Sequence, residues 1–356
     1  MPLIVKTMPS RKLVTGTVTA AFHHFPGESE LNLPHEFLAL SQQIGADPLL
    51  VQGPGGNTSI KVDNQMWIKA SGTLLADALN HDIFVAVDPQ KAILELDGAS
   101  DGSCRSALID LAGQLRPSIE TTFHAMFPQK FVFHFHSVAT ICHAITVEGR
   151  EALSTKLDGL SWVSTPYRKP GIPLSLAIRE AVGTKTIEVI VLDNHGVIVV
   201  ADSIERISGL IDEVESRLQL PVQSNVGLCG SASFTGWTAV PEAAALITNT
   251  KVRDRAISGT YYPDHVVFLG PALPLMTADE FSKVNPAELP VPVVLVEGEG
   301  AYIKSNATPA HRAMLDCIHD VLIRIPPDWT LLPIGEEAET ELLNWDAEKY
   351  RQMLAK

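Results

Sequence analysis

The sequence predicts a mixed α/β fold, because its 356 residues contain both strand patterns and helix patterns. Residues 131–135 are aromatic and β-branched, which is typical of a strand. Residues 189–200 contain two more β-branched runs, separated by the turn-like tripeptide Asn194-His195-Gly196. Residues 203–218 carry apolar side chains at helical spacing opposite an acidic face, which predicts an amphipathic helix packed on the core.

The first part of the chain predicts a helix followed by two strands. Apolar residues recur at helical spacing over residues 34–44, and residues 58–62 and 66–70 are predicted as strands. The glycines of residues 53–56 precede these strands, and they either form a tight turn or let backbone N–H groups approach an anion. Pro117-Ser118 predicts a helix start, with Ser118 as the N-cap and Glu120 in the first turn.

The later elements are predicted from helical spacing, β-branched runs and prolines. We expect helices at residues 137–145, 174–182, 241–248, 310–323 and 337–354, a strand at 266–269 and a hairpin from 291–296 and 302–304. Residues 221–230 are predicted as a linker. Gly298 and Gly300 do not form a dinucleotide fingerprint, because a third glycine and a surrounding βαβ unit are missing, so no nicotinamide cofactor is expected.

Composition limits the class of partner. The formal net charge of -14 argues against nucleic acid, whose phosphates require clustered Lys and Arg, but a local pocket can still bind a small anion. The hydrophobic content of 46% is sufficient for two packed domains. No Cys-x-x-Cys spacing or long apolar run occurs, so we expect no disulfide framework or cysteine-based zinc site, no membrane span and a cytoplasmic location.

Three histidines form the candidate metal site. His134 and His136 are two residues apart on a predicted strand, so their side chains face the same way and can converge on one ion. For this pair alone, the interpretation as ordinary core or rim histidines is about as good as the interpretation as metal ligands. His195 is the candidate third ligand, and three histidines with an open fourth position are typical of catalytic zinc. Taken alone, Glu120 is best interpreted as an ordinary acidic residue in the first turn of a helix. It would lie near the histidines if that helix folds back across the strand.

Five motifs in this order and spacing resemble the class II aldolase/adducin family. They are GPGGNTS at residues 53–59, KASGT at 69–73, RPSIE at 116–120, HFH at 134–136 and NHG at 194–196. The resemblance covers residues 30–220. Residues 262–270 resemble the extension in the aldolase half of bifunctional rhamnulose-1-phosphate aldolase/short-chain dehydrogenases, and we expect the dehydrogenase half to be missing.

The resemblance implies a three-layer α/β/α fold around a mostly antiparallel sheet, assembled as a homo-oligomer, usually a tetramer. We expect this domain at residues 30–220 and a smaller α+β C-terminal extension at residues 225–356. The implied activity is a metal-dependent lyase that reversibly cleaves a ketose phosphate or a related sugar into dihydroxyacetone phosphate and an aldehyde. Zn²⁺ or another divalent ion bound by His134, His136 and His195 would stabilise the enediolate, and Glu120 would transfer the proton.

The resemblance also implies a phosphate site. Its residues would be Gly56, Asn57, Ser71, Gly72 and Ser118. Lys69 would add a cation there or point to solvent, and Tyr167 either borders the pocket or packs beside a proline turn. Ile119 stands where fuculose-phosphate aldolases often have a second serine. The phosphate site is therefore less well supported by the sequence than the metal site. A decarboxylase or other enediolate-forming lyase, and a non-catalytic adducin-like interaction module, are therefore the alternatives.

Overall fold

The computed structural model describes residues 33–99, 102–111, 113–223, 230 and 232–354. The described residues from Leu33 onward belong to one compact unit. Residues 30–32 of the expected first domain and residues 224–229 of the expected linker lie outside the described residues. A division of the chain near residue 220 therefore stays a prediction. Within the described ranges, no helix has both the length and the apolar character needed to cross a membrane.

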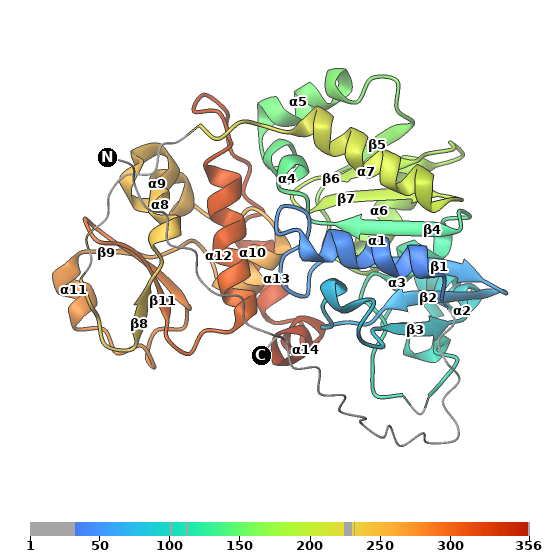
Figure 1. Ribbon diagram of the computed structural model, residues 1–356, viewed down its shortest axis with the longest axis horizontal. Helices are drawn as coiled ribbons and strands as arrows, with labels where there is room; N and C mark the ends of the chain where they lie inside the picture. Colours follow the sequence, from blue (N-terminus) through green and yellow to red (C-terminus); the bar gives the residue numbers. More distant parts are fainter. Residues whose placement is uncertain (1–32, 100–101, 112, 224–229, 231, 355–356) are drawn as a thin grey trace, which may run out of the picture. The chain divides into compact units, whose positions relative to one another are not determined.

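The larger sheet has seven strands, visible on the right of Figure 1. The strands are β1 (Asn57–Val62), β2 (Gln65–Lys69), β3 (Phe84–Val87), β4 (Phe131–Phe135), β5 (Trp162–Thr165), β6 (Val189–Leu192) and β7 (Gly196–Ala201). Their spatial order is β3-β2-β1-β4-β7-β6-β5, and every neighbouring pair is antiparallel except β5 and β6. The histidine-bearing strand β4 therefore lies in the middle of the sheet.

Helices cover both faces of this sheet. Phe37 of α1 (His35–Ala46) packs on the rings of Phe131 and Phe133, which face one side of β4. Phe123 of α3 (Thr121–Met126) shares a core with Val132, which faces the other side because successive strand residues alternate. The expected three-layer α/β/α arrangement around a mostly antiparallel sheet is confirmed.

Of the other helices of this part, those at residues 138–144, 172–182 and 204–218 were predicted from the sequence, whereas those at residues 89–94 and 147–156 were not. These helices are α2 (Pro89–Leu94), α4 (Val138–Ala144), α5 (Val147–Lys156), α6 (Ile172–Val182) and α7 (Ile204–Leu218). The apolar stripe of α7 is buried, as predicted, and Ser203 caps the helix by accepting a hydrogen bond from the backbone N–H of Arg206.

The C-terminal part has its own sheet and packs on helix α4. Strands β8 (Trp237–Ala239), β9 (Leu275–Met276), β10 (Val293–Val296) and β11 (Gly300–Lys304) are ordered β8-β11-β10-β9, and β10 and β11 form the predicted hairpin. The helices are α8 (Ala245–Thr248), α9 (Thr250–Ala256), α10 (Pro263–Leu269), α11 (Ala278–Ser282), α12 (Pro309–Leu322), α13 (Glu336–Leu343) and α14 (Asp346–Leu354). Buried residues of α4, α10 and α12 share one hydrophobic core, so the C-terminal part is packed against helix α4, which follows the histidine-bearing strand.

Two predictions for the C-terminal part are wrong. Residues 266–269 were expected as a strand, but they form the end of helix α10, which starts with Pro263 and has Asp264 in its first turn. A short apolar run that is buried on all sides does not distinguish a strand from a helix. The single helix expected at residues 337–354 is two helices, because α13 ends at Leu343, where the Asn344 side chain donates to the Thr340 carbonyl.

Candidate active site

The strand register brings residues from distant parts of the sequence together at the middle of the sheet. His134 lies opposite Asn57 of β1 on one side and opposite Ile198 of β7 on the other. His136 follows the last residue of β4, and His195 lies in the turn that joins β6 to β7. Asn194, with a φ of 53°, anchors this turn by donating from Nδ2 to the carbonyls of Tyr261 (2.9 Å) and Leu332 (2.6 Å).

The three predicted histidines converge. Ligand nitrogens of His134, His136 and His195 all lie within 4.8 Å of one another, and all three side chains are buried. Burial lowers the pKa of His134 and His195, which favours the neutral imidazole that binds metals. The Nε2 atoms of His134 and His136 are 3.2 Å apart, close to the spacing of about 3.3 Å between two ligands of a tetrahedral zinc ion.

The donor set fits a divalent ion. Nδ1 of His134 lies 3.0 Å from the Val197 carbonyl, which leaves its Nε2 lone pair directed into the site. Nδ1 of His195 is buried and has no hydrogen-bond partner among the described residues. Three buried imidazoles whose ligand nitrogens converge are the ligands expected for an open zinc-type site.

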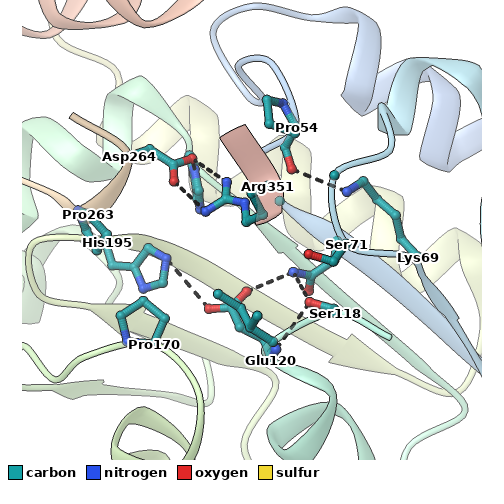
Figure 2. Close-up of a pocket in the computed structure, with 15 residues that line it drawn as sticks. Pro54, Lys69, Ser71, Ser118, Glu120, Pro170, His195, Pro263, Asp264 and Arg351 are labelled. Carbon is teal, nitrogen blue, oxygen red and sulfur yellow. Dashed lines mark hydrogen bonds and ion pairs between the residues drawn. The ribbon is translucent and has the colours of Figure 1, made fainter. Parts of the chain in front are cut away.

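Glu120 lies beside these histidines. Its Oε2 is 3.5 Å from His134 Nε2 and its Oε1 is 3.7 Å from His195 Nε2. Oε2 accepts a hydrogen bond from Asn57 Nδ2 (2.8 Å), whereas the buried Oε1 has no hydrogen-bond partner among the described residues. One carboxylate oxygen is thus fixed and the other faces the site (Figure 2).

The predicted helix start before Glu120 is wrong by about two residues. Helix α3 begins at Thr121, so Glu120 occupies the N-cap position and Ser118 lies before the helix. Ser118 Oγ accepts the backbone N–H of Glu120 (3.2 Å), and it also accepts from Asn57 Nδ2 (3.1 Å). These contacts turn the chain so that the Glu120 carboxylate points at the histidines rather than at its own helix.

A buried chain of polar groups behind Asn57 was missed by the sequence analysis. Asn57 Oδ1 is 2.5 Å from Nε2 of His124, and His124 Nδ1 is 2.8 Å from Ser59 Oγ. Burial holds the pKa of His124 well below its ordinary value, so the ring is neutral and donates to Asn57 Oδ1 with one nitrogen. Asn57 is thereby held with its Nδ2 group toward Glu120.

One cavity of about 30 Å³ joins the candidate groups. Its wall includes Glu120, His136 and His195 together with the predicted phosphate-site residues Gly56, Asn57, Ser71, Gly72 and Ser118. Lys69 also lines it and is buried, with Nζ 3.3 Å from the Pro54 carbonyl (Figure 2), so it does not point to solvent. Burial lowers the pKa of Lys69 to about 7.

A larger cavity of about 630 Å³ adjoins the first and shares Ser71, Ile119 and Pro170 with it. Arg105, Arg116 and Lys169 contribute cations to the described part of its wall. Asp346 is the one carboxylate among the described wall residues. The Arg116 guanidinium lies 3.7 Å from the ring centre of Tyr350, and Lys169 Nζ lies 4.6 Å from that of Trp345, so α14 and the turn before it form one wall.

The sequence analysis also missed two charged residues of the C-terminal part. Asp264 of α10 lies 3.2 Å from His136 through its Oδ2 atom, and Arg351 of α14 binds both oxygens of the same carboxylate (Figure 2). Burial alone would raise the pKa of Asp264, but Arg351 and His136 hold it below its usual value. The stretch at residues 262–270 was noted only as a resemblance to a C-terminal extension, and nothing in the sequence assigned Asp264 or Arg351 to the site, because their contacts arise from packing between distant segments.

Two other residues, Tyr167 and His143, lie apart from this chemistry. Tyr167 is not among the described residues that line either cavity, its hydroxyl has no described hydrogen-bond partner, and burial raises its pKa. His143 of α4 lies with Nδ1 3.0 Å from the Ala139 carbonyl and its ring against Trp329. Both side chains belong to the packing of the protein.

Comparisons with known proteins extend these observations. A curated relative from Bacillus subtilis (strain 168), described as "Uncharacterized oxidoreductase YuxG", is 30% identical over 194 residues, which are 49% of this chain and 28% of that protein. This chain thus spans less than a third of that relative's length, which is compatible with a resemblance to one part of a longer protein.

Solved structures are similar over about half of the chain. The N-terminal class II aldolase domain of a conserved protein from Thermoplasma acidophilum is 25% identical, with a TM-score of 0.46, 56% of this chain covered and 96% of that one. L-fuculose-1-phosphate aldolase from Thermus thermophilus is 16% identical, with a TM-score of 0.34, 52% of this chain covered and 92% of that one. The model of the family described as "Class II Aldolase and Adducin N-terminal domain" matches residues 35–222, more than half of the chain, and the chain therefore belongs to this family.

Proposed function

We propose that this protein is a metal-dependent class II aldolase that cleaves a ketose phosphate or a related sugar into dihydroxyacetone phosphate and an aldehyde. The observation that carries the proposal is the convergence of three buried histidines beside the Glu120 carboxylate, next to a cavity that Glu120, His136 and His195 line. A divalent ion bound by His134, His136 and His195 would supply a positive charge beside the substrate's carbonyl oxygen. Family membership supports a lyase with a metal site at this position.

Glu120 is the group proposed to move the proton. Asn57 holds its Oε2, so the unpartnered Oε1 is the atom that would deliver a proton to the carbon left carbanionic by cleavage and would remove that proton in the reverse, condensation direction. Because Asn57 holds the carboxylate and Ser118 holds both the Glu120 backbone N–H and Asn57, little reorganisation is needed when substrate binds. His124 supports this arrangement from behind Asn57.

The two cavities support an anionic substrate. The small cavity carries Lys69, Ser71 and Ser118, which are the donors proposed for a phosphate group. The adjoining cavity is large enough for a sugar phosphate, and its described wall carries cations in excess of carboxylates. In a chain with a net charge of -14, such a local excess of cations favours an anionic ligand.

Metal content is the first test. The purified protein is expected to contain about one zinc or similar divalent ion per chain, and the His134→Ala/His136→Ala variant is expected to contain none. His81→Ala is the matched control, because this histidine is exposed and should leave the metal content unchanged. The loaded protein is then screened with ketose phosphates by a coupled assay for dihydroxyacetone phosphate. Absence of metal after incubation with excess divalent ion would contradict the mechanism and favour the non-catalytic interaction module.

The aliphatic side chain of Ile119 supports one alternative reaction. It lines both cavities at the position where a second hydroxyl would favour phosphate binding. A decarboxylase or other carbanion-forming lyase would use the same histidines and Glu120 on a substrate without phosphate at this point. Release of carbon dioxide from sugar acids, with no cleavage of ketose phosphates by the metal-loaded protein, would favour this alternative.

A further inference from the structure

The C-terminal part contacts one of the candidate metal ligands, His136, through Asp264. His136 Nε2 faces His134, and its Nδ1 lies 3.2 Å from Asp264 Oδ2. In this arrangement Nδ1 carries the proton that is donated to the carboxylate, which leaves the Nε2 lone pair free for a metal. Asp264 belongs to α10, which lies outside residues 35–222, the range matched by the family model.

Arg351 fixes Asp264 in turn. Its Nη1 donates to Asp264 Oδ1 (2.9 Å) and its Nη2 to Asp264 Oδ2 (3.2 Å), a two-point contact that orients the carboxylate plane. Glu348, one turn earlier on α14, accepts from Nη1 through both oxygens at 3.1 and 2.8 Å. The side chains of Asp264, Glu348 and Arg351 are all buried, so the contacts are not screened by solvent.

The surrounding backbone leaves the His136–Asp264 pair little freedom to move. A Cβ atom at Gly55 would lie 2.9 Å from His136 Nδ1 and 3.0 Å from Asp264 Oδ2. The glycine-rich loop therefore closes over the contact between the ring and the carboxylate, and only glycine permits this approach. Residues from α14, α10 and the strand β4 are thus connected by direct contacts that end at a candidate ligand.

We propose that Asp264 and Arg351 are positioning residues of the metal site: Asp264 fixes the tautomer and orientation of the His136 ring, and Arg351 fixes Asp264. The C-terminal part thereby determines how tightly the histidines bind a metal ion. This inference rests on the metal site of the proposed function. Residues that orient a metal ligand typically change metal affinity by about 10–100-fold when mutated.

Metal affinity of the 356-residue chain tests the inference directly. Co²⁺ and Zn²⁺ are titrated into the metal-free protein in competition with a chelator, and the visible absorption of bound Co²⁺ reports the ligand geometry. Asp264→Asn and Arg351→Gln are expected to weaken metal binding by about 10–100-fold and to alter the Co²⁺ spectrum. Arg351→Lys, which retains the charge without the two-point contact, is expected to recover part of the affinity.

Arg312→Gln is the matched control. Arg312 lies on α12, forms ion pairs with Glu242 and Asp316, and is outside the described walls of both cavities. Thermal melting of the metal-free variants shows whether each one folds. If Asp264→Asn does not fold, the metal affinities of Arg351→Gln and Arg351→Lys test the inference instead. Unchanged affinity and spectrum in folded Asp264→Asn or Arg351→Gln would overturn the inference while leaving the metal site intact. A wild-type protein that binds no metal would instead overturn the proposed function as well.

Discussion

At the scale of single residues, the two oxygens of Glu120 have different environments, and this difference leads to a prediction. Glu120→Gln preserves the shape of the side chain and its contact with Asn57 but removes the proton acceptor. We expect kcat to fall by about 10²–10⁴-fold, the usual contribution of a general base, with the metal content unchanged. Steady-state kinetics and metal analysis of the same preparation provide the measurement.

Glu205→Gln serves as the comparison for this variant, because Glu205 is an exposed acid in the first turn of α7 and should leave both quantities at the wild-type level. If Glu120→Gln lost its metal, Glu120 would instead be acting chiefly as a ligand. If it kept full activity, another group would have to transfer the proton.

Lys69 gives a prediction about pH. Burial lowers its pKa to about 7, so the side chain is a cation below that pH and neutral above it. If Lys69 binds the substrate phosphate, KM should rise roughly tenfold between about pH 6 and pH 8, the equivalent of losing a charge-assisted hydrogen bond worth about 1.5 kcal/mol. This rise should be absent from Lys69→Met, whose KM should be high at both pH values.

The control for Lys69 is Lys61→Met. Lys61 has a pKa lowered to about 8, chiefly by burial, but its Nζ donates to the Gln129 carbonyl and it does not line either cavity. This variant should retain the wild-type dependence of KM on pH. A similar rise of KM in Lys69→Met would assign the dependence to the substrate or to another group.

The sequence predicts some site residues and not others for a physical reason. His134 and His136 are two apart on a strand, and Glu120 and Ser118 share a short segment, so local spacing suffices to bring each pair together. Asp264 and Arg351 are 87 residues apart and meet His136 only through tertiary packing. Such contacts leave no periodic signal in the sequence.

At the scale of elements, α10 shows where periodicity fails. Every residue from Pro263 to Leu269 is buried, so the helix has no polar face that would reveal a period of 3.6 residues. The predictions for α7 and α12 were accurate because each has a polar face and a capping residue, Ser203 and Thr308. The β10–β11 hairpin was equally clear because the β-branched strand β10 and the Tyr302-Ile303 pair of β11 flank a glycine-containing turn.

The burial of α10 leads to a prediction about acid stability. His265 is fully buried, both ring nitrogens lack a hydrogen-bond partner among the described residues, and burial lowers its pKa to about 3. Between about pH 6.5 and pH 3 the unfolded chain binds a proton there that the folded chain does not. The free energy of unfolding should therefore fall with decreasing pH by roughly 1.4 kcal/mol per pH unit from this residue.

His265→Phe should remove that contribution, because the ring stays apolar at every pH and lies near Tyr261 and Tyr262. Urea unfolding at several pH values measures the slope for both proteins. His81→Ala, which replaces an exposed histidine, is the reference and should retain the wild-type slope. An identical slope in His265→Phe would mean that His265 is protonated equally in the folded and unfolded states.

At the scale of the whole molecule, the candidate site is assembled from both parts of the chain. Strands β1 and β4 and the β6–β7 turn supply Asn57, the histidine pair and His195, while α10 and α14 supply Asp264 and Arg351. Asn194 ties the β6–β7 turn to the carbonyls of Tyr261 and Leu332 in the C-terminal part. Metal binding should therefore stabilise both parts together rather than the larger sheet alone.

Metal removal tests this coupling. A ligand at a concentration of about 100 times its Kd stabilises the folded state by about 2.7 kcal/mol, so the metal-loaded protein should melt at a higher temperature than the chelator-treated protein. Trp67 lies on β2 of the larger sheet and Trp237 on β8 of the smaller one, so single-tryptophan variants report each part separately. The melting temperatures reported by Trp67 and by Trp237 should both rise on adding metal. Neither should rise in the His134→Ala/His136→Ala background. A shift at Trp67 without one at Trp237 would show that the two parts unfold independently and that the contacts through Asp264, Arg351 and Asn194 do not couple them.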